Sequence, residues 1–230
     1  MNASALKDQI EAADAARPHD LLWISSIEVI FAPCALPDWV RKAIAATPIV
    51  VVRRAARSGN AIPVGIRGQA RSERFAAFIA PHAVRKRITP ENLVQTRRWR
   101  EIPRPESAAM RRALESVAAR WNGFRWGPAG SVGFELATGL PVTTDKSDLD
   151  LVIHAPQRIT ANEAEVLLKS VAGLEVRADV RIETPFGSVA LQEHASPTSP
   201  RILMKTCAGP MLVADPWMHP IEEAPLPAAS

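Results

Sequence analysis

Two aspartates at the start of an apolar run constrain this chain more than any other feature. Asp148 precedes the apolar run LDLVIHA (149–155), and Asp150 is the second residue of that run, which is typical of a buried strand. Residues i and i+2 of a strand share a face, so both carboxylates are expected side by side. Adjacent carboxylates repel unless a cation lies between them, and Mg²⁺ prefers oxygen ligands. The spacing therefore predicts a magnesium site at the edge or end of a sheet.

A glycine-containing loop precedes the two acids. It contains Gly130 and Ser131, within WGPAGSVGFELATG (126–139). Small residues let backbone N–H groups approach a phosphate, a following helix N-terminus attracts negative charge, and Ser131 adds a hydroxyl donor. A phosphate-binding loop beside a metal site is typical of phosphoryl or nucleotidyl transfer.

Such chemistry calls for a third carboxylate. If residues 176–183 are extended, Asp179, Arg181 and Glu183 share one face of a second strand. We expect Asp179 to complete the metal site and to accept the proton of an attacking hydroxyl. Glu183 is the second candidate for this role, and the sequence does not decide between the two acids.

Positive charge is concentrated in one segment. Between Arg53 and Arg100 stand twelve Arg and Lys residues and two acids, in a chain of formal charge +4. Arginine binds phosphate oxygens with two parallel hydrogen bonds, so the segment suits a phosphorylated ligand, a nucleic acid or an acidic protein. A plain solvated basic surface is the alternative. The expected phosphate-binding side chains are Arg53, Arg67, Arg71, Arg74 and, near the end of a later strand, Lys205.

The chain is long enough for two domains. The proline-containing stretch REIPRPES (100–107) is a candidate linker, which would divide an Arg-rich α+β domain (1–100) from a catalytic domain (101–230). After residue 105 helical and strand patterns alternate, which predicts an α+β fold with a mixed sheet and flanking helices.

Local patterns predict the individual elements. In the first half we expect a helix over 37–46, a hairpin of 48–54 with 61–68, and a helix over 71–79. In the second half we expect a helix near 110–121, a capped helix from Thr160, and strands over 149–155, 174–183, 187–195 and 201–206.

Composition indicates a protein of the cytoplasm with no membrane contact. No run of about 18 uncharged apolar residues occurs, and the first twenty residues lack the apolar core of a secretory signal. Cys34 and Cys207 are too few for a disulfide framework, and we expect them to be buried small residues.

The constellation of Gly130-Ser131, the two acids and Asp179 resembles the DNA polymerase beta-like nucleotidyltransferase superfamily. The details are similar to one family in it, the phosphoribosyl-dephospho-CoA transferases, also called malonate decarboxylase holo-acyl-carrier-protein synthases. The strings that carry the resemblance span nearly the whole chain: RPHDLLWI (17–24), VVRRA (51–55), IPVGIRG (62–68), RSERFAA (71–77), GSVGFELATGLP (130–141), SDLDLVI (147–153), DVRIETPFGSVALQE (179–193) and KTCAGPMLVADPW (205–217).

The resemblance implies a reaction and its participants. The family moves 2′-(5″-phosphoribosyl)-3′-dephospho-CoA from a triphosphoribosyl precursor to a serine of the malonate decarboxylase acyl carrier protein, with release of diphosphate. By this resemblance Asp148 and Asp150 match the essential acid pair, Gly130-Ser131 the phosphate-holding pair, and Asp179 the third carboxylate. Asp148 follows Ser131 by 17 positions, a longer separation than in minimal members of the superfamily.

Two other functions remain possible from the sequence. A nucleotidyltransferase that uses ATP on a small molecule or a protein would need the same acids. A non-catalytic, Arg-rich nucleic-acid-binding protein is disfavoured, because the acids are intact and the basic segment lacks interleaved aromatic residues for base stacking. We therefore expect no nucleic-acid partner.

Overall fold

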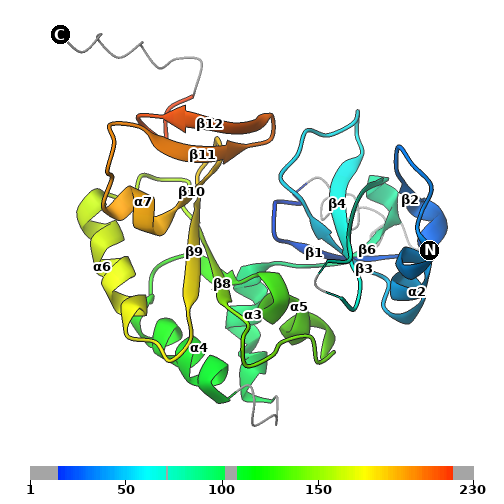
Figure 1. The fold of residues 1–230 in the computed structure, drawn as a ribbon, viewed down its shortest axis with the longest axis horizontal. Helices are drawn as coiled ribbons and strands as arrows, with labels where there is room; N and C mark the ends of the chain where they lie inside the picture. The colour runs from blue at the N-terminus through cyan, green and yellow to red at the C-terminus, as the bar shows by residue number, and fades with distance from the viewer. Residues whose placement is uncertain (1–14, 71, 102–107, 220–230) are drawn as a thin grey trace.

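The computed structural model describes residues 15–70, 72–101 and 108–219, which form two six-stranded sheets with flanking helices (Figure 1). The first sheet is antiparallel, with strand order β2-β5-β4-β3-β1-β6. The second is mixed, with order β12-β11-β10-β9-β8-β7, because β8 and β9 run parallel. The predicted α+β class, with a mixed C-terminal sheet, is confirmed.

The first sheet contains the predicted hairpin, since β3 and β4 pair antiparallel. Helix α2 (Asp38–Ala46) matches the predicted helix and packs on the sheet through Val40 and Ile44. The strands are β1 (Leu21–Ile24), β2 (Ile30–Phe31), β3 (Ile49–Val52), β4 (Ile62–Arg67), β5 (Arg74–Ile79) and β6 (Val84–Ile88), joined in part by the short helices η1 (Ile27–Val29) and η2 (Pro81–Ala83).

The predicted helix over 71–79 is wrong. Residue 71 lies outside the described part, and β5 pairs with β4 along its length, from Ile62 opposite Ile79 to Arg67 opposite Arg74. Ala77 and Ile79 are buried on one face, so the apolar side chains follow the period of two that a strand requires. Cross-strand pairing outweighs the local sequence preference here.

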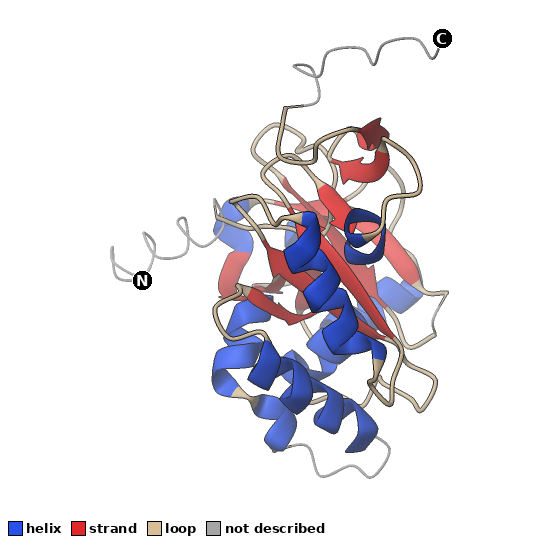
Figure 2. Cartoon of the chain, turned by 90° about the vertical axis from the view of Figure 1, so that its left-hand side faces the viewer, coloured by secondary structure: helices blue, strands red, loops and turns tan. Residues whose placement is uncertain are grey.

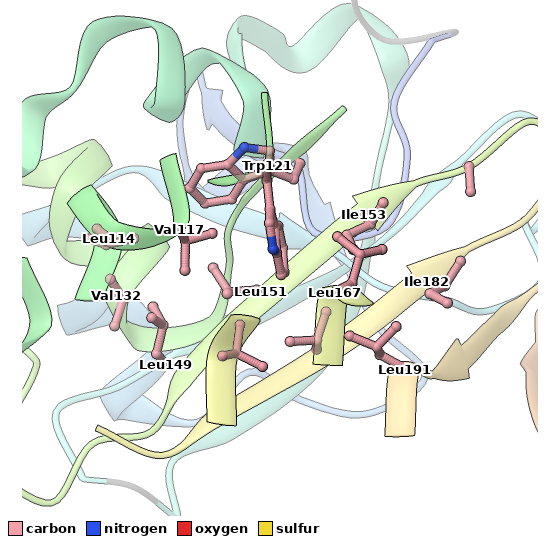
Figure 3. Close-up of a cluster of buried hydrophobic side chains, with 14 of the residues drawn as sticks. Leu114, Val117, Trp121, Val132, Leu149, Leu151, Ile153, Leu167, Ile182 and Leu191 are labelled. Carbon is pink, nitrogen blue, oxygen red and sulfur yellow. The ribbon is translucent and has the colours of Figure 1, made fainter. Parts of the chain in front are cut away.

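The second sheet carries the larger apolar core on one face. Leu149, Leu151 and Ile153 of β8 point toward the helices, where Val117 and Leu167 pack against them (Figure 3). Its strands are β7 (Trp126–Pro128), β8 (Leu149–His154), β9 (Ala178–Glu183), β10 (Ser188–Ala190), β11 (Ile202–Thr206) and β12 (Gly209–Val213). The helices that pack on this sheet are α3 (Pro90–Thr96) and η3 (Arg98–Arg100), which come from the first hundred residues, and α4 (Ala108–Arg120), α5 (Gly130–Thr138), α6 (Ala161–Ala172) and α7 (Leu191–Ala195) from the second half, several of them in front of the sheet in Figure 2.

Several predictions for this half are confirmed and others need correction. Helix α6 begins after Thr160 with the capping box, in which Thr160 and Glu163 exchange hydrogen bonds. The strand expected over 187–195 ends at Ala190 and continues as α7, whose Glu193 and His194 hydrogen-bond to Leu203 and Ile159. Strand β9 begins only at Ala178, and β12 was not expected.

The two halves pack directly on each other. Leu21 and Ile49 of the first sheet belong to the same buried cluster as the core of the second. Helix α3 lies so close to β7 that a Cβ on Gly127 would be 2.1 Å from the Pro90 carbonyl oxygen. Residues 102–107 of the expected linker lie outside the described part, so the domain boundary at residue 100 stays a prediction.

Two further observations concern compartment and membrane. In the described ranges, no helix is both long and apolar enough to cross a bilayer. Cys34 and Cys207 are exposed thiols, so the expectation that they are buried is wrong. Cys34 lies in the loop before α2 and Cys207 in the turn between β11 and β12, both outside the two cores.

Candidate active site

A cleft of about 860 Å³ lies between the two sheets and receives side chains from both. Strand alternation places the acidic face of the second sheet toward this cleft, because the opposite face holds the helices. The charged residues that line it are His19, Arg53, Arg54, Arg67 and Arg74 from the first half and Asp150, Asp179, Arg181 and Lys205 from the second.

Two of the predicted acids, Asp150 and Asp179, come together in this cleft, and Asp148 lies next to them outside its lining. Asp150 and Asp179 are register partners on the parallel strands β8 and β9, and Asp148 stands just before β8. Burial raises the pKa of Asp150, and the negative charges of Asp179 and Asp148 raise it further. The charges of His19 and Arg74 act in the opposite direction but do not cancel this effect.

The donor chemistry of these acids suits a hard divalent cation. Asp150 and Asp179 offer paired carboxylates whose mutual repulsion a cation relieves, with Asp148 adjacent. Among the described residues, no three His, Cys, Asp or Glu side chains are already grouped as a metal site. Mg²⁺ needs no such group, because it is usually bound by one or two carboxylates, water and substrate phosphates. The residues present therefore fit Mg²⁺, and the three-ligand site stays a prediction.

Helix α5 presents its N-terminus to the same acids. It begins at Gly130, which has φ +56° and lies so close to Asp150 that a Cβ would be 1.8 Å from Oδ2. The preceding Ala129 caps the helix without a side-chain hydrogen bond. Amide groups of an uncapped first turn bind anions, and Gly130 and Gly133 line the cleft. Ser131 is half-buried in that turn and, like Asp148, is not part of the cleft lining.

A buried glutamate that the sequence reasoning missed fixes the segment between α5 and β8. One oxygen of Glu135 accepts hydrogen bonds from the backbone of Val142 and Thr143, at 2.8 and 2.7 Å, and from the Thr143 hydroxyl. Thr144 and Ser147 then close a turn that leads directly into Asp148. The long separation between Ser131 and Asp148 is thus an anchored loop.

The first sheet contributes a cationic wall. Arg53 follows β3, while Arg67 and Arg74 are register partners at the end of β4 and the start of β5, where the chain joins the two strands, and all three line the cleft. Lys205 approaches from β11 on the other side. These four positions agree with a phosphate-binding role. The fifth predicted residue, Arg71, lies outside the described residues.

Glu183 has a different role from the one considered in the sequence. It is only 7% exposed, accepts a hydrogen bond from the Arg54 guanidinium and lies 3.2 Å from Nε2 of His19. Burial alone would raise its pKa, but the His19 hydrogen bond and the Arg54 charge lower the pKa to about 2. Glu183 is therefore committed to an ion pair between the two halves, which favours Asp179 as the third carboxylate.

A second contact between the halves lies nearby. Glu91 of α3 is 2.8 Å from Nδ1 of the buried His154 on β8 and 3.2 Å from the Arg17 guanidinium. Burial opposes ionisation of Glu91, but the His154 interaction outweighs it and holds the pKa well below its usual range. His154 on β8 is the register partner of Glu183 on β9. The Glu91–His154 and Arg54–Glu183 contacts therefore lie at the same end of these two strands.

Sequence reasoning missed His19 as a cleft residue and did not single out Arg54 or Arg181 as phosphate-binding side chains. His19 has a φ of +75°, a left-handed conformation that is uncommon outside glycine. Arg181 shares the face of Asp179 and donates to the Ser188 hydroxyl and carbonyl at 3.3 and 3.2 Å. Strand periodicity does place Arg181 on this face, and Arg54 belongs to the basic segment, but His19 gives no local signal.

Gly130→Ala tests the contact between α5 and the acids. A methyl group there would collide with Asp150, so we expect transfer activity to fall at least about 10²-fold, as when a catalytic group is misplaced. Gly139→Ala is the matched control, because Gly139 also has positive φ (+78°) but no atom within 4 Å of its added Cβ. Equal activity losses in the two variants would show that backbone strain alone explains the effect.

Glu183→Gln tests the ion pair by its pH dependence. The depressed pKa stabilises the fold above about pH 4.5, and this stabilisation is lost as pH falls toward 2. At pH 7 the variant should lose about 3 kcal/mol of unfolding free energy, the cost of breaking a buried pair, and the difference should shrink below pH 4.5. Urea unfolding across this pH range measures it.

The control for that measurement is Glu175→Gln, which removes an exposed ion pair with Arg112. Exposed pairs contribute little stability, so this variant should unfold like the unmodified chain at every pH. A Glu183→Gln difference that does not change with pH would contradict the assignment.

Comparison with known proteins identifies related chains over most of the length. The model of the phosphoribosyl-dephospho-CoA transferase MdcG N-terminal domain matches residues 17–90, and that of the C-terminal domain matches residues 95–216. Proteins named phosphoribosyl-dephospho-CoA transferase are similar to the chain. The one from Pseudomonas fluorescens (strain Pf0-1) is 39% identical over 90% of this chain and 96% of its own. The one from Klebsiella pneumoniae (strain 342) is 40% identical over 87% and 96%. No solved structure matches significantly.

Proposed function

The chain belongs to the phosphoribosyl-dephospho-CoA transferase family, and on this premise we propose that it transfers the phosphoribosyl-dephospho-CoA group from a triphosphate precursor to a serine of an acyl carrier protein, releasing diphosphate. The carrier proposed is the acyl carrier subunit of malonate decarboxylase. The exposed thiols Cys34 and Cys207 suit the reducing cytoplasm as its compartment.

One observation carries the proposal: a single cleft holds paired carboxylates, an uncapped helix N-terminus and an arginine wall. This combination suits a polyphosphate substrate. It also favours the precursor over the carrier as the ligand of Arg53, Arg67 and Arg74, because these side chains line the cleft and do not lie on an outer surface. A plain solvated basic surface would not place three arginines opposite two aspartates.

The chemistry follows from these positions. The serine oxygen forms a bond to the α-phosphorus while the bond from that phosphorus to the oxygen of the leaving diphosphate breaks. Asp179 accepts the serine proton, and the amides of the first turn of α5 with Arg67 and Arg74 hold the phosphate oxygens. Bound at Asp148, Asp150 and Asp179, Mg²⁺ would supply charge neutralisation for the phosphates. The raised pKa of Asp150 reflects repulsion that such a ligand relieves.

Transfer itself is tested by incubating the chain with apo carrier, the triphosphoribosyl precursor and Mg²⁺, and measuring the intact mass of the carrier. We expect the carrier to gain one phosphoribosyl-dephospho-CoA group. With ATP in place of the precursor, we expect no change. A nucleotidyl adduct from ATP alone would instead support a nucleotidyltransferase of different specificity.

Substitution of the acids separates chemistry from binding. Asp148→Asn and Asp150→Asn should abolish transfer, whereas Asp179→Asn should lower kcat about 10²-fold or more and leave precursor affinity by calorimetry intact. Because burial and two neighbouring carboxylates disfavour the ionised form of Asp150, Asp150→Asn should also raise the melting midpoint, which thermal unfolding measures. Full turnover in the Asp150 variant would contradict the mechanism.

Removal of the arginines tests the cationic wall. Arg53→Ala, Arg67→Ala and Arg74→Ala should each raise the KM for the precursor and weaken its salt dependence, because each removes a charge that faces the phosphates. Arg112→Ala is the control, since Arg112 is exposed away from the cleft and pairs with Glu175. An unchanged KM in all three cleft variants would support the solvated-surface interpretation.

A further inference from the structure

The hairpin of β11 and β12 exposes apolar side chains on the acidic side of the second sheet. Leu203 and Leu212 are register partners, 40% and 59% exposed, and Lys205 is likewise paired with Pro210. These four residues form what we call the hairpin face. Lys205 pairs with Ser188, which in turn pairs with Glu183, so the hairpin face continues the sheet face that holds the acids.

The hairpin face begins inside the cleft and extends out of it. Lys205 and Pro210 belong to the cleft lining, whereas Leu203 and Leu212 do not. Arg54 of the first half contacts Glu183 on β9, so the first sheet lies over this strand. The hairpin of β11 and β12 extends beyond the first sheet (Figure 1). The face is therefore a rim of the cleft that the described part of the chain leaves exposed.

Only one of the two substrates of the proposed reaction needs such a rim. The cleft accommodates the phosphates of a small precursor, whereas a protein acceptor must insert a serine while its body remains outside. Its body must then rest on surface continuous with the cleft and near Asp179. Leu203 and Leu212 meet this condition, because they stand in the cross-strand row next to that of Lys205 and Pro210.

We propose that the hairpin face is the docking surface for the acyl carrier protein, an inference that rests on the proposed function. The partner it fits has apolar side chains beside its serine, which cover Leu203 and Leu212, and acidic side chains that meet Lys205. Charge favours this occupant over a second copy of the chain. In a symmetric dimer formed through this face, Lys205 and the nearby cleft arginines of one copy would approach the same positively charged residues of the other copy.

Leu212→Glu and Leu203→Glu test the docking surface. Each places a negative charge against an acidic partner, so the KM for the carrier should rise at least 10-fold, while kcat at saturating carrier and precursor affinity by calorimetry stay unchanged. Leu212→Ala should give a smaller rise of the same kind, which guards against misfolding of the charged variants. Val166→Glu is the matched control, because Val166 is 68% exposed on α6, in the helix layer.

The outcomes separate this proposal from the proposed function. If the unmodified chain transfers the group and the hairpin variants keep its KM for the carrier, the docking surface is wrong and the function stands. If the unmodified chain binds precursor but modifies no carrier, both proposals fail. A change of oligomeric state by sedimentation, without a change of KM, would show that the face joins copies of this chain and would overturn the docking proposal.

Discussion

A buried carboxylate ties the two halves of this protein together at the cleft. Glu183 stands on the same strand face as Asp179 and accepts the Arg54 guanidinium and the His19 ring from the first half. An isolated charge at such a depth would be costly, so its pKa of about 2 shows how strongly those partners hold it ionised. Because Arg53 adjoins Arg54 in the chain, the same contact sets the position of the cationic wall over the acids.

The surroundings of Glu183 favour its ionised form, whereas the surroundings of Asp150 oppose ionisation. Asp150 is half-buried beside two other negative charges, and its raised pKa means that ionisation is less favourable in the fold than in water. Gly130 makes this tight arrangement possible, since any larger residue would displace the carboxylate. Under the proposed function, which gives the cleft a polyphosphate substrate, this repulsion has a reason: favourable interactions are reserved for the bound ligand. Glu183 thus stabilises the cleft, while Asp150 is held in a repulsive environment that a bound cation would relieve.

Sequence periodicity predicted the features that depend on neighbouring residues. The spacing of Asp148 and Asp150, the strand face of Asp179 and the capping box of Thr160 all follow from local rules, and the structure contains each of them. Contacts between distant segments could not be predicted in this way. Arg54 and His19 stand 129 and 164 residues from Glu183, and β5 was misread as a helix because its partner strand was unknown. The metal and the carrier remain predictions.

The central claim is that the Glu183–Arg54 contact joins the two halves, and a double-mutant cycle measures it most directly. Unfolding free energies of the unmodified chain, Glu183→Gln, Arg54→Ala and the double variant, taken at pH 7, give the coupling between the two side chains. We predict a coupling of about 1 kcal/mol or more, with the double variant little worse than the more damaging single variant. Free-energy losses that add to within about 0.5 kcal/mol would contradict the account.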